Sequence, residues 1–313
     1  MIRDLGLGSD ERTTRTTVTA QIPDPKSLIP VVITRFAPAP TGYLHLGHVL
    51  NAIYVWDIAR ASGPDGRVLL RIEDHDRMRS RPEFEAALLE DLDWLGFVAD
   101  GELTRQSERG AMYERALDDL RQRGLTYACE CSRADVGSGP YPGTCRHKNL
   151  SESPGLGMRV RLDPSVERFE DLRLGPQEQR PSEQGGDVLV RDRHGNWTYQ
   201  FAVVVDDWMQ DVNLVIRGED LLDSTGRQIQ LARLLGREQP PAFLHHELLM
   251  KTPTQKLSKS DGDTGVRDLR AKGWSAEAVI DRAAALAGLS RDQITRRLSP
   301  ELPSVKTRMT HRP

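Results

Sequence analysis

The sequence predicts an α/β protein built on an open sheet of parallel strands, and two segments near its start support this prediction. An apolar, β-branched run at residues 31–34 leads into a turn rich in proline and glycine, after which apolar residues recur at helical spacing. A second apolar strand, at residues 67–72, ends in the acidic residues Glu73 and Asp74. Because the carboxyl ends of parallel strands face the ligand crevice of such a sheet, we expect a binding site there.

The remaining elements are predicted from the spacing of apolar residues and from turn residues. The expected helices span residues 82–95, 106–123 with Gly124 as the C-terminal cap, and 276–289. The expected strands include residues 158–162 and 187–191, residues 197–207 should form a buried helix or strand, and a strand from Val212 should lead through a polar turn into a helix that contains Gln228.

Length and composition limit the possible classes of protein. At 313 residues the chain can bury one substantial core and carry an inserted or appended subdomain. Its 38% hydrophobic and 28% charged residues are typical of a soluble globular protein, and a net charge of −3 means that a nucleic-acid partner would need a local basic surface. No apolar run approaches a membrane span, and residues 1–30 lack the apolar core of a signal peptide. We therefore expect a cytoplasmic protein with a flexible N-terminal tail.

The turn after the first strand carries the candidate catalytic residues. Residues 35–48 read Arg-Phe-Ala-Pro-Ala-Pro-Thr-Gly-Tyr-Leu-His-Leu-Gly-His, which places His45 and His48 at the start of the next helix. A helix N-terminus offers free N–H groups and a partial positive charge, and both suit a phosphate. Histidines there can donate hydrogen bonds to a phosphoryl group as negative charge develops on it. An ordinary strand–helix turn with two surface histidines is the alternative.

All three cysteines of the chain lie in one segment rich in glycine and proline. An odd number of cysteines so close together does not make a disulfide framework, whereas Cys129, Cys131 and Cys145 suit three corners of a tetrahedral zinc site. A fourth ligand must come from nearby, and general ligand chemistry favours His147. Three reduced structural cysteines are the alternative.

The motifs together resemble those of class I aminoacyl-tRNA synthetases. His45-Leu-Gly-His48 resembles the His-Ile-Gly-His signature of that family, and Lys256-Leu-Ser-Lys259-Ser260 resembles its Lys-Met-Ser-Lys-Ser signature. Residues 35–42, and the run Arg-Ile-Glu-Asp-His-Asp at residues 71–76, are close to the glutamyl branch of the family. The resemblance covers roughly residues 34–293 and implies a Rossmann-like catalytic domain that is split by a zinc-bearing insertion and followed by a short helical segment.

The resemblance also implies a division of the chain. The implied units are the N-terminal tail (residues 1–30), the first half of the catalytic domain (31–125), a zinc-bearing acceptor-binding insertion (126–190), the second half of the catalytic domain (191–250), and the Lys-Leu-Ser-Lys-Ser loop with the C-terminal helical segment (251–313).

Site residues follow from the same resemblance, position by position. It assigns catalysis to His45, His48, Lys256 and Lys259, ATP binding to His45, Gly47, His48 and Lys259, and glutamate binding to Arg35, Ala37, Ala39, Glu73, Tyr199 and Arg217. Arg217 also follows an apolar strand, which is unusual for a solvated arginine. Ala39 replaces the family's serine and His75 its threonine, so hydroxyl contacts are lost at both positions. The spacing from Tyr141 to Cys145 matches the family's zinc site, so the resemblance favours Tyr141 as the fourth ligand.

The function that the resemblance implies is activation of L-glutamate by ATP and Mg²⁺ as glutamyl-adenylate. Complete glutamyl enzymes continue into a large helical anticodon-binding domain, and we expect no room for one after Ser260. The short form is similar to members that attach glutamate to the modified base queuosine in the anticodon arm of tRNA(Asp). A compact enzyme that charges the 3′ end of tRNA(Glu) is one alternative. A non-catalytic nucleotide-binding zinc protein is the other.

Overall fold

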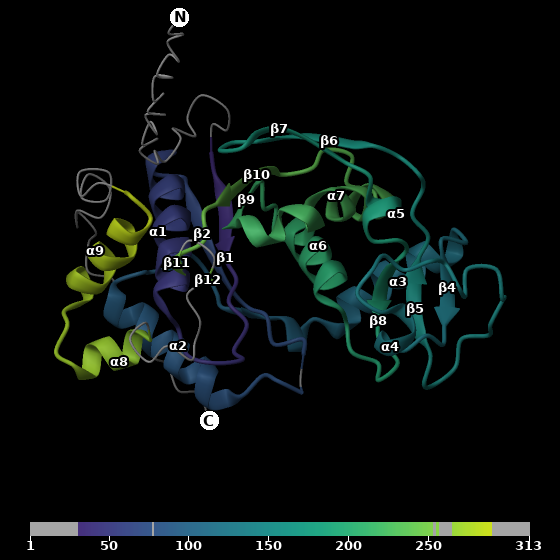
Figure 1. Cartoon of the computed structure of the whole chain (residues 1–313), viewed down its shortest axis with the longest axis horizontal. Helices are drawn as coiled ribbons and strands as arrows, with labels where there is room; N and C mark the ends of the chain where they lie inside the picture. Colours follow the sequence, from purple (N-terminus) through teal and green to yellow (C-terminus); the bar gives the residue numbers. More distant parts are fainter. Residues whose placement is uncertain (1–30, 77, 253–254, 257–264, 290–313) are drawn as a thin grey trace, which may run out of the picture.

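The parallel strands predicted near the start of the chain form a three-stranded group, and later residues form a four-stranded group beside it (Figure 1). These two hydrogen-bonded groups are the halves of the central sheet. The computed structural model describes residues 31–76, 78–252, 255–256 and 265–289. The first half contains β1 (Ile33–Phe36), β2 (Arg67–Ile72) and β3 (Thr104–Arg105), all parallel. The second half contains β9 (Leu214–Gly218) and β10 (Ala242–His246), also parallel, and the hairpin of β6 (Glu167–Asp171) and β7 (Gly175–Gln179).

Asn213 joins the two halves of the sheet. Its backbone N–H donates to the carbonyl of Ile33 at 2.9 Å, and its side-chain oxygen accepts from the N–H of Ile33 at 2.8 Å. The junction therefore places the start of β9 beside the start of β1. Further along the two strands, Nη1 of Arg35 donates to the carbonyl of Ile216 at 3.3 Å. The carboxyl ends of β1 and β9 thus also lie side by side, and ligands bind at such ends in open α/β sheets.

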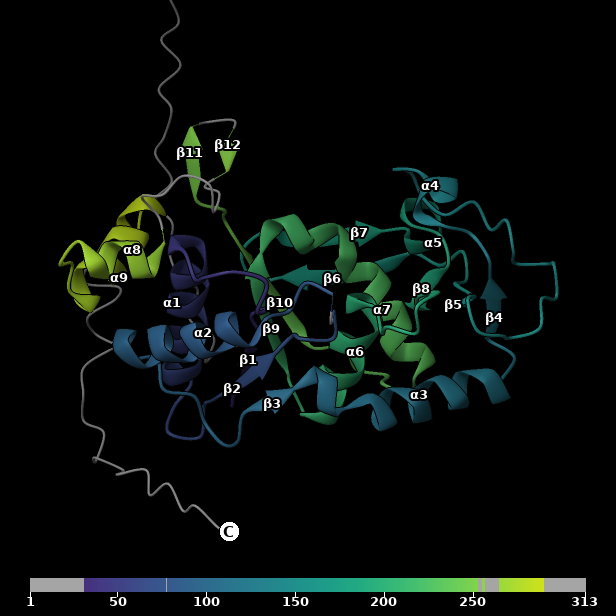
Figure 2. The same cartoon turned by 90° about the horizontal axis from the view of Figure 1, so that it is seen from below.

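Helices of the N- and C-terminal parts pack together beside this junction (Figures 1 and 2). They are α1 (Leu46–Ala61), α2 (Pro82–Leu95), α8 (Val266–Ala271) and α9 (Ala276–Leu286). The expected bounds of α2 are confirmed, because Pro82 fits the first helical turn and Gly96, with φ of 78°, permits the left-handed C-terminal cap. Apolar residues from α1, α2 and α9 share one core cluster with β1, β2 and β9.

The helix expected over residues 106–123 begins later than predicted. Residues Gln106–Glu108 form a 3₁₀ turn, η2, and α3 runs from Gly110 to Gln122. Two contacts hold the first turn apart from the helix: the carboxylate of Asp74 accepts from the N–H and hydroxyl of Ser107, and the amide of Gln106 donates to Asp206. Gly124, with φ of 68°, follows the end of α3 as expected.

The segment expected as an insertion, residues 126–190, contributes to two sheets. Strands β4 (Thr126–Cys129), β5 (Gly157–Val160) and β8 (Val188–Arg191) form a separate antiparallel sheet, whereas β6 and β7 extend the parallel sheet next to β10. The short helices α4 (Arg133–Val136) and α5 (Pro181–Gln184) flank the small sheet. The predicted domain boundaries stay a prediction.

Residues 197–207, predicted to form either a helix or a strand, are mainly helical. The helix α6 (Tyr199–Met209) packs with α3 and with α7 (Thr225–Leu234), which follows the 3₁₀ segment η3 (Glu219–Ser224). Strands β11 (Met250–Thr252) and β12 (Gln255–Lys256) pair as an antiparallel hairpin after β10. In the described parts of the chain, no helix has the length and apolar character needed to cross a membrane.

Asp91, on the buried side of α2, provides a test of the packing around this helix. Its side chain is fully buried, and neither carboxylate oxygen has a hydrogen-bond partner among the described residues. Burial raises the pKa of Asp91 to about 6, although Arg267 and Arg270 oppose this shift. Because the folded protein holds this proton more tightly than the unfolded chain, the free energy of unfolding should fall as the pH rises from about 4 to about 7.

In Asp91→Asn this component of the pH dependence should disappear. Between about pH 4.5 and about pH 7.5 the variant should therefore gain about 1 kcal/mol or more of stability relative to the wild type. Urea unfolding of both proteins at both pH values measures the difference. An equal pH dependence of the two proteins would show that Asp91 is ionised in the folded state at low pH.

Candidate active site

A cleft of about 340 Å³ opens at the junction of the two halves of the sheet. Its walls come from the ends of β1, β2, β9 and β10 and from the start of α1, as expected for a parallel sheet. The cleft brings together many of the residues that the sequence singled out: Arg35, Ala37, Ala39, His45, Gly47, His48, Glu73, Tyr199 and Arg217. The predicted site residues thus lie in one place, although they are scattered over much of the chain.

His45 and His48 cap the first turn of α1 with their imidazole rings. Nδ1 of His45 accepts from the N–H of Gly47 at 3.1 Å, and Nδ1 of His48 accepts from the N–H of His45 at 3.1 Å. Since each Nδ1 accepts a hydrogen bond, the hydrogen of each neutral ring lies on Nε2. Both rings line the cleft, where an N–H donor suits an anionic oxygen.

Gly47 makes this arrangement of the rings possible. A Cβ at position 47 would lie 3.0 Å from Nδ1 of His45 and 2.9 Å from its Cε1, and the second distance is shorter than real Cβ atoms show. A side chain at this position would push the His45 ring away from the helix cap. Glycine between the two histidines is therefore a steric requirement of the cap.

The loop between β1 and α1 is fixed by the segment after β2. The N–H of Glu73 donates to the carbonyl of Pro38 at 3.0 Å, and the N–H of Arg81 donates to the carbonyl of Pro40 at 3.1 Å. These bonds hold Ala37 and Ala39 at the wall of the cleft, where only backbone groups and methyl groups are available to a ligand.

Arg35 is buried and bound to a carboxylate of the protein. Its Nε donates to Oδ1 of Asp207 at 3.0 Å, and Nη1 of Arg71 donates to the same oxygen at 2.8 Å. The two guanidinium groups hold the pKa of Asp207 below its usual range, although burial alone would raise it. Asp207, on α6, therefore links β1 and β2 of the first half of the chain to the second half.

Glu73 lies at the edge of this ionic cluster, where β2 ends. One of its carboxylate oxygens lies 3.6 Å from Nη2 of Arg71. Burial raises the pKa of Glu73, and Arg71 and Arg35 oppose that shift. Because Glu73 also lines the cleft, its carboxylate can receive a cationic group of a ligand.

Arg217 differs from Arg35 because its hydrogen-bond partners in the described part of the chain are all neutral. Its Nε donates to Nε2 of His245 at 3.0 Å. The remaining hydrogen bonds of the guanidinium go to the side chains of Tyr199 (3.4 Å), Gln228 (2.7 Å) and Thr225 (2.8 Å). The side chain is 4% exposed, and burial lowers its pKa. Among the described residues no carboxylate lies within ion-pair distance of Arg217, so this buried cation can accept an anionic ligand.

The two lysines expected in the active site are not both described. Lys259 lies outside the described residues, and of Lys256 only the backbone, in β12, is described. Gly265, the first described residue after this motif, pairs with His45 in a β-bridge, and Val266 donates to the carbonyl of Leu44 at 3.0 Å. The described chain on the C-terminal side of the motif thus returns to the start of α1.

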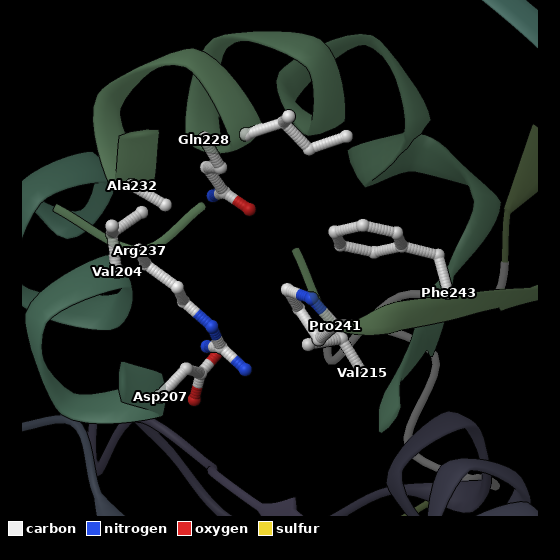
Figure 3. Close-up of a pocket in the computed structure, with 9 residues that line it drawn as sticks. Val204, Asp207, Val215, Gln228, Ala232, Arg237, Pro241 and Phe243 are labelled. Carbon is white, nitrogen blue, oxygen red and sulfur yellow. The ribbon is translucent and has the colours of Figure 1, made fainter. Parts of the chain in front are cut away.

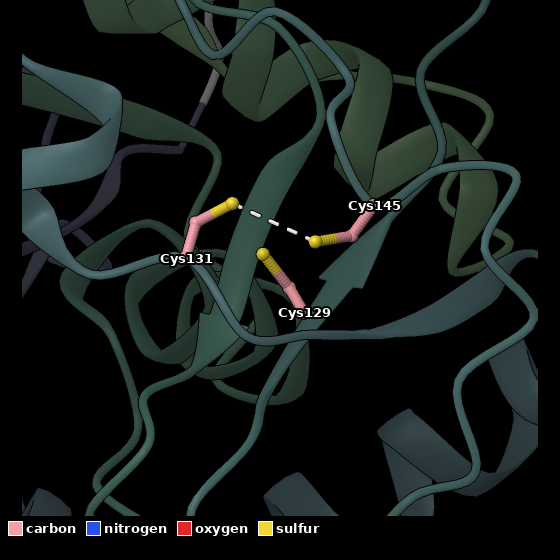
Figure 4. A group of neighbouring side chains, drawn as sticks. All are labelled: Cys129, Cys131 and Cys145. Carbon is pink, nitrogen blue, oxygen red and sulfur yellow. Dashed lines mark hydrogen bonds between the residues drawn. The ribbon is translucent and has the colours of Figure 1, made fainter.

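The three cysteines form a compact cluster where β4 ends and the chain continues toward β5 (Figure 4). Their sulfur atoms all lie within 4.8 Å of one another, and Sγ of Cys131 is 3.5 Å from Sγ of Cys145. In a tetrahedral zinc site the sulfur atoms lie about 3.8 Å apart, because each Zn–S bond is about 2.3 Å long. The cluster therefore fits three corners of such a site.

Tyr141, and not His147, lies against this cluster. The hydroxyl of Tyr141 is 3.5 Å from Sγ of Cys129, and the side chain is buried. His147 is exposed and does not belong to the group of side chains close enough to share an ion. Arg159 packs over the Tyr141 ring at 3.6 Å and donates to Sγ of Cys129 at 3.2 Å, which places a positive charge beside the sulfur atoms.

A second, much smaller pocket lies between α6, α7 and the strands β9 and β10 (Figure 3). Its volume of about 20 Å³ has room for roughly one water molecule, so it cannot hold a substrate. Its wall includes Asp207 and Gln228, which contact Arg35 and Arg217 respectively. This pocket thus lies behind the two arginines of the cleft.

Several residues of the site were missed in the sequence. Asp206 and Asp207 end an apolar run, yet both are buried, and Asp206 accepts from Arg109 and Tyr113. Asn51 also lines the cleft and contacts His246 at 2.9 Å. Its position one helical turn after His48 was a signal that could have identified it.

Comparison with known proteins adds a family to this geometry. The model of the family described as "tRNA synthetases class I (E and Q), catalytic domain" matches residues 31–137 and 146–302. A solved glutamate tRNA ligase from Elizabethkingia meningosepticum, in complex with its amino acid, superposes with a TM-score of 0.71 at 27% identity. That comparison covers 86% of this chain and 64% of the ligase, so the chain spans less than two thirds of the ligase.

Curated relatives are more similar and extend over most of their own length. A glutamyl-Q tRNA(Asp) synthetase from Rhodobacter capsulatus is 42% identical, over 78% of this chain and 96% of the relative. A protein with the same name from Bordetella bronchiseptica is 44% identical, over 74% of this chain and 75% of the relative. The family match, the fold and these relatives agree that the chain belongs to the class I tRNA synthetases and, among them, to the glutamyl-Q tRNA(Asp) synthetase family.

Proposed function

We propose that this protein activates L-glutamate with ATP as glutamyl-adenylate and transfers the glutamate to queuosine in the anticodon arm of tRNA(Asp). The names of the curated relatives support glutamate as the amino acid and tRNA(Asp) as the acceptor. The observation that carries the proposal is Arg217, a buried cation in the cleft with neutral partners only among its described hydrogen bonds. A substrate carboxylate would compensate that charge.

The glutamate site contains two further charged groups with different tasks. Glu73, at the wall of the cleft, would receive the ammonium group of the amino acid. Arg35 keeps its ion pair with Asp207 and would add a second cation for a carboxylate, and the hydroxyl of Tyr199 lies beside Arg217. Ala37 and Ala39 would close the pocket with backbone groups. Two cations for two carboxylates favour glutamate over glutamine.

The ATP site would use the start of α1. His45 and His48 would donate from Nε2 to the α-phosphate as adenylation proceeds, and Gly47 leaves room for that geometry. Lys256 and Lys259 would bind the leaving pyrophosphate, and Mg²⁺ would enter with ATP as part of that substrate. The negative charge of the phosphates would thus be stabilised by histidines at the start of α1 and by lysines near residue 256.

A single Zn²⁺ would be held by Cys129, Cys131, Tyr141 and Cys145. Three thiolates and a phenolate form a tetrahedral donor set, and zinc would supply structural cross-linking there. The cluster belongs to the small sheet and not to the cleft, so the ion would stabilise this part of the chain without touching ATP. The cytoplasmic location expected from the sequence stays a prediction.

The function is tested in two steps that use the whole protein. The first is ATP–pyrophosphate exchange with glutamate, which should be faster than exchange with glutamine by about 10⁴-fold, because an amide leaves a buried guanidinium uncompensated. The second is transfer of labelled glutamate to tRNA(Asp) that carries either queuosine or guanosine in the anticodon. We expect transfer to the queuosine form only.

The alternatives give different results in the same assays. Efficient charging of the 3′ end of tRNA(Glu), whether or not queuosine is present, would replace the proposal by a compact tRNA(Glu) enzyme. Absence of any glutamate-dependent exchange would favour a non-catalytic nucleotide-binding protein. An isolated anticodon stem-loop with queuosine should suffice as acceptor, because its unstacked bases can enter a protein pocket.

Two substitutions of His45 separate its catalytic role from its role as a helix cap. His45→Ala should slow exchange by about 10²-fold or more and should also cost about 1 kcal/mol of stability. His45→Asn should restore the cap, because its side-chain oxygen can accept from the N–H of Gly47, but it should leave exchange slow. Thermal unfolding and exchange rates measure the two effects. Exchange close to wild type in His45→Asn would remove the histidine from catalysis.

Metal analysis of three proteins tests the zinc site. The wild type and His147→Ala should each carry one zinc ion per chain, whereas Tyr141→Phe should lose zinc or bind it more weakly, because the phenolate oxygen is missing. Loss of zinc should impair the folding of the small sheet more than it lowers the rate of ATP–pyrophosphate exchange. Zinc lost in His147→Ala but kept in Tyr141→Phe would identify the histidine as the fourth ligand.

A further inference from the structure

Arg217 is held from behind by a short chain of buried side chains. Its Nε donates to Nε2 of His245 at 3.0 Å, and Nδ1 of His245 lies 2.7 Å from Oδ2 of Asp171. The exposed fractions of Asp171, His245 and Arg217 are 1%, 0% and 4%. The three residues therefore form one buried Asp–His–Arg row whose last member reaches the cleft.

The sheet itself sets up this row. Asp171 ends β6, which pairs in parallel with β10, and His245 of β10 lies opposite Arg217 of β9 in the parallel register. Adjacent parallel strands thus present the three side chains at the same edge of the sheet. Their order across the sheet is the order of their hydrogen bonds.

The direction of the hydrogen bonds follows from the chemistry of the end groups. An ionised carboxylate only accepts, so Nδ1 of His245 carries the hydrogen and Nε2 keeps its lone pair for Arg217. Burial lowers the pKa of His245, which keeps the ring neutral. Burial alone would raise the pKa of Asp171, but hydrogen bonds from His245 and from the N–H groups of Leu174 and Arg173 hold it low.

We propose that Asp171 and His245 are positioning residues that orient the guanidinium of Arg217 toward the substrate carboxylate. This inference rests on the proposed role of Arg217 in glutamate binding. A guanidinium has five N–H groups, and those engaged by His245, Gln228 and Thr225 fix its plane. The second N–H of Nη2, which has no hydrogen bond among the described residues, and the long contact of Nη1 with Tyr199 at 3.4 Å are left for a ligand.

A neutral imidazole is suited to this task in a way that a carboxylate would not be. A carboxylate in direct contact with Arg217 would orient it but would also compensate its charge, which would weaken its attraction for a substrate carboxylate. His245 instead accepts a hydrogen bond without carrying a charge, and the charged Asp171 contacts His245 on the side away from Arg217. The row therefore fixes the geometry of the cation and preserves its charge for the ligand.

Asp171 also has a structural task, which the test must separate from positioning. Its Oδ1 accepts from the N–H groups of Arg173 and Leu174 and so holds the turn between β6 and β7. Loss of this turn alone would lower the fraction of folded protein, and hence the apparent kcat, at an unchanged KM for glutamate. Loss of orientation at Arg217 would raise the KM for glutamate.

The experiment measures glutamate-dependent ATP–pyrophosphate exchange of the full chain and its variants. In His245→Leu and Asp171→Asn the KM for glutamate should rise by about 10-fold or more, while the KM for ATP stays within about twofold. In His245→Gln the amide oxygen can accept from Arg217, so its KM for glutamate should lie closer to the wild type than that of His245→Leu. This partial rescue would not follow from a structural role.

Asp187→Asn serves as the matched control. Asp187 is also a buried carboxylate that accepts several hydrogen bonds, but it lies outside the cleft, so its KM for glutamate should not change. A KM for glutamate within twofold of the wild type in both His245→Leu and Asp171→Asn would overturn the proposal. Absence of glutamate-dependent exchange in the wild type would instead overturn the proposed function.

Discussion

The shared oxygen of Asp207 is the interaction on which the rest of the site depends. Arg35 from β1 and Arg71 from β2 both donate to it, so a single carboxylate on α6 ties the first half of the chain to the second. Buried charges of this kind destabilise the protein by several kcal/mol if one partner is removed, because the remaining charge cannot reach water. The cleft forms where these halves meet, so this ion pair fixes the position of one wall of the cleft relative to the other.

The two arginines of the cleft are consequently in different electrostatic states. Arg35 is compensated before any ligand arrives, whereas the described hydrogen-bond partners of Arg217 are all neutral. An anion that entered the cleft would gain most from Arg217 and less from Arg35, because Asp207 already compensates the charge of Arg35. The asymmetry would give a ligand with two carboxylates a defined orientation, because its two ends would meet cations of unequal strength.

Much of the site could be predicted from the sequence, because strand ends are visible as apolar runs that stop at charged residues. Glu73 and Arg217 were found in this way, and the clustered cysteines, whose sulfur atoms the structure brings within 4.8 Å of one another, were found by their chemistry. The burial of Asp206 and Asp207 could not be predicted, since the local pattern is that of a helix ending in polar residues. The pairing of β6 with β10 also escaped prediction, because contacts between distant segments leave no local periodicity. The later start of α3 could not be predicted for the same reason, because it depends on contacts with Asp74 and Asp206, which are remote from this helix in the sequence.

The imidazole cap of α1 has a consequence for the cost of reorganisation during a reaction. Folding selects a single tautomer for His45 and His48, because backbone N–H groups occupy both Nδ1 atoms. The hydrogen on each Nε2 is thus in place in the folded protein, so an anion that bound there would require no change of tautomer. The free energy needed to select the Nε2–H tautomer is part of the free energy of forming the helix and does not recur when a ligand binds. Any anion bound at these donors in turn favours the capped form, so occupancy of the cleft and the order of the first helical turn are thermodynamically linked.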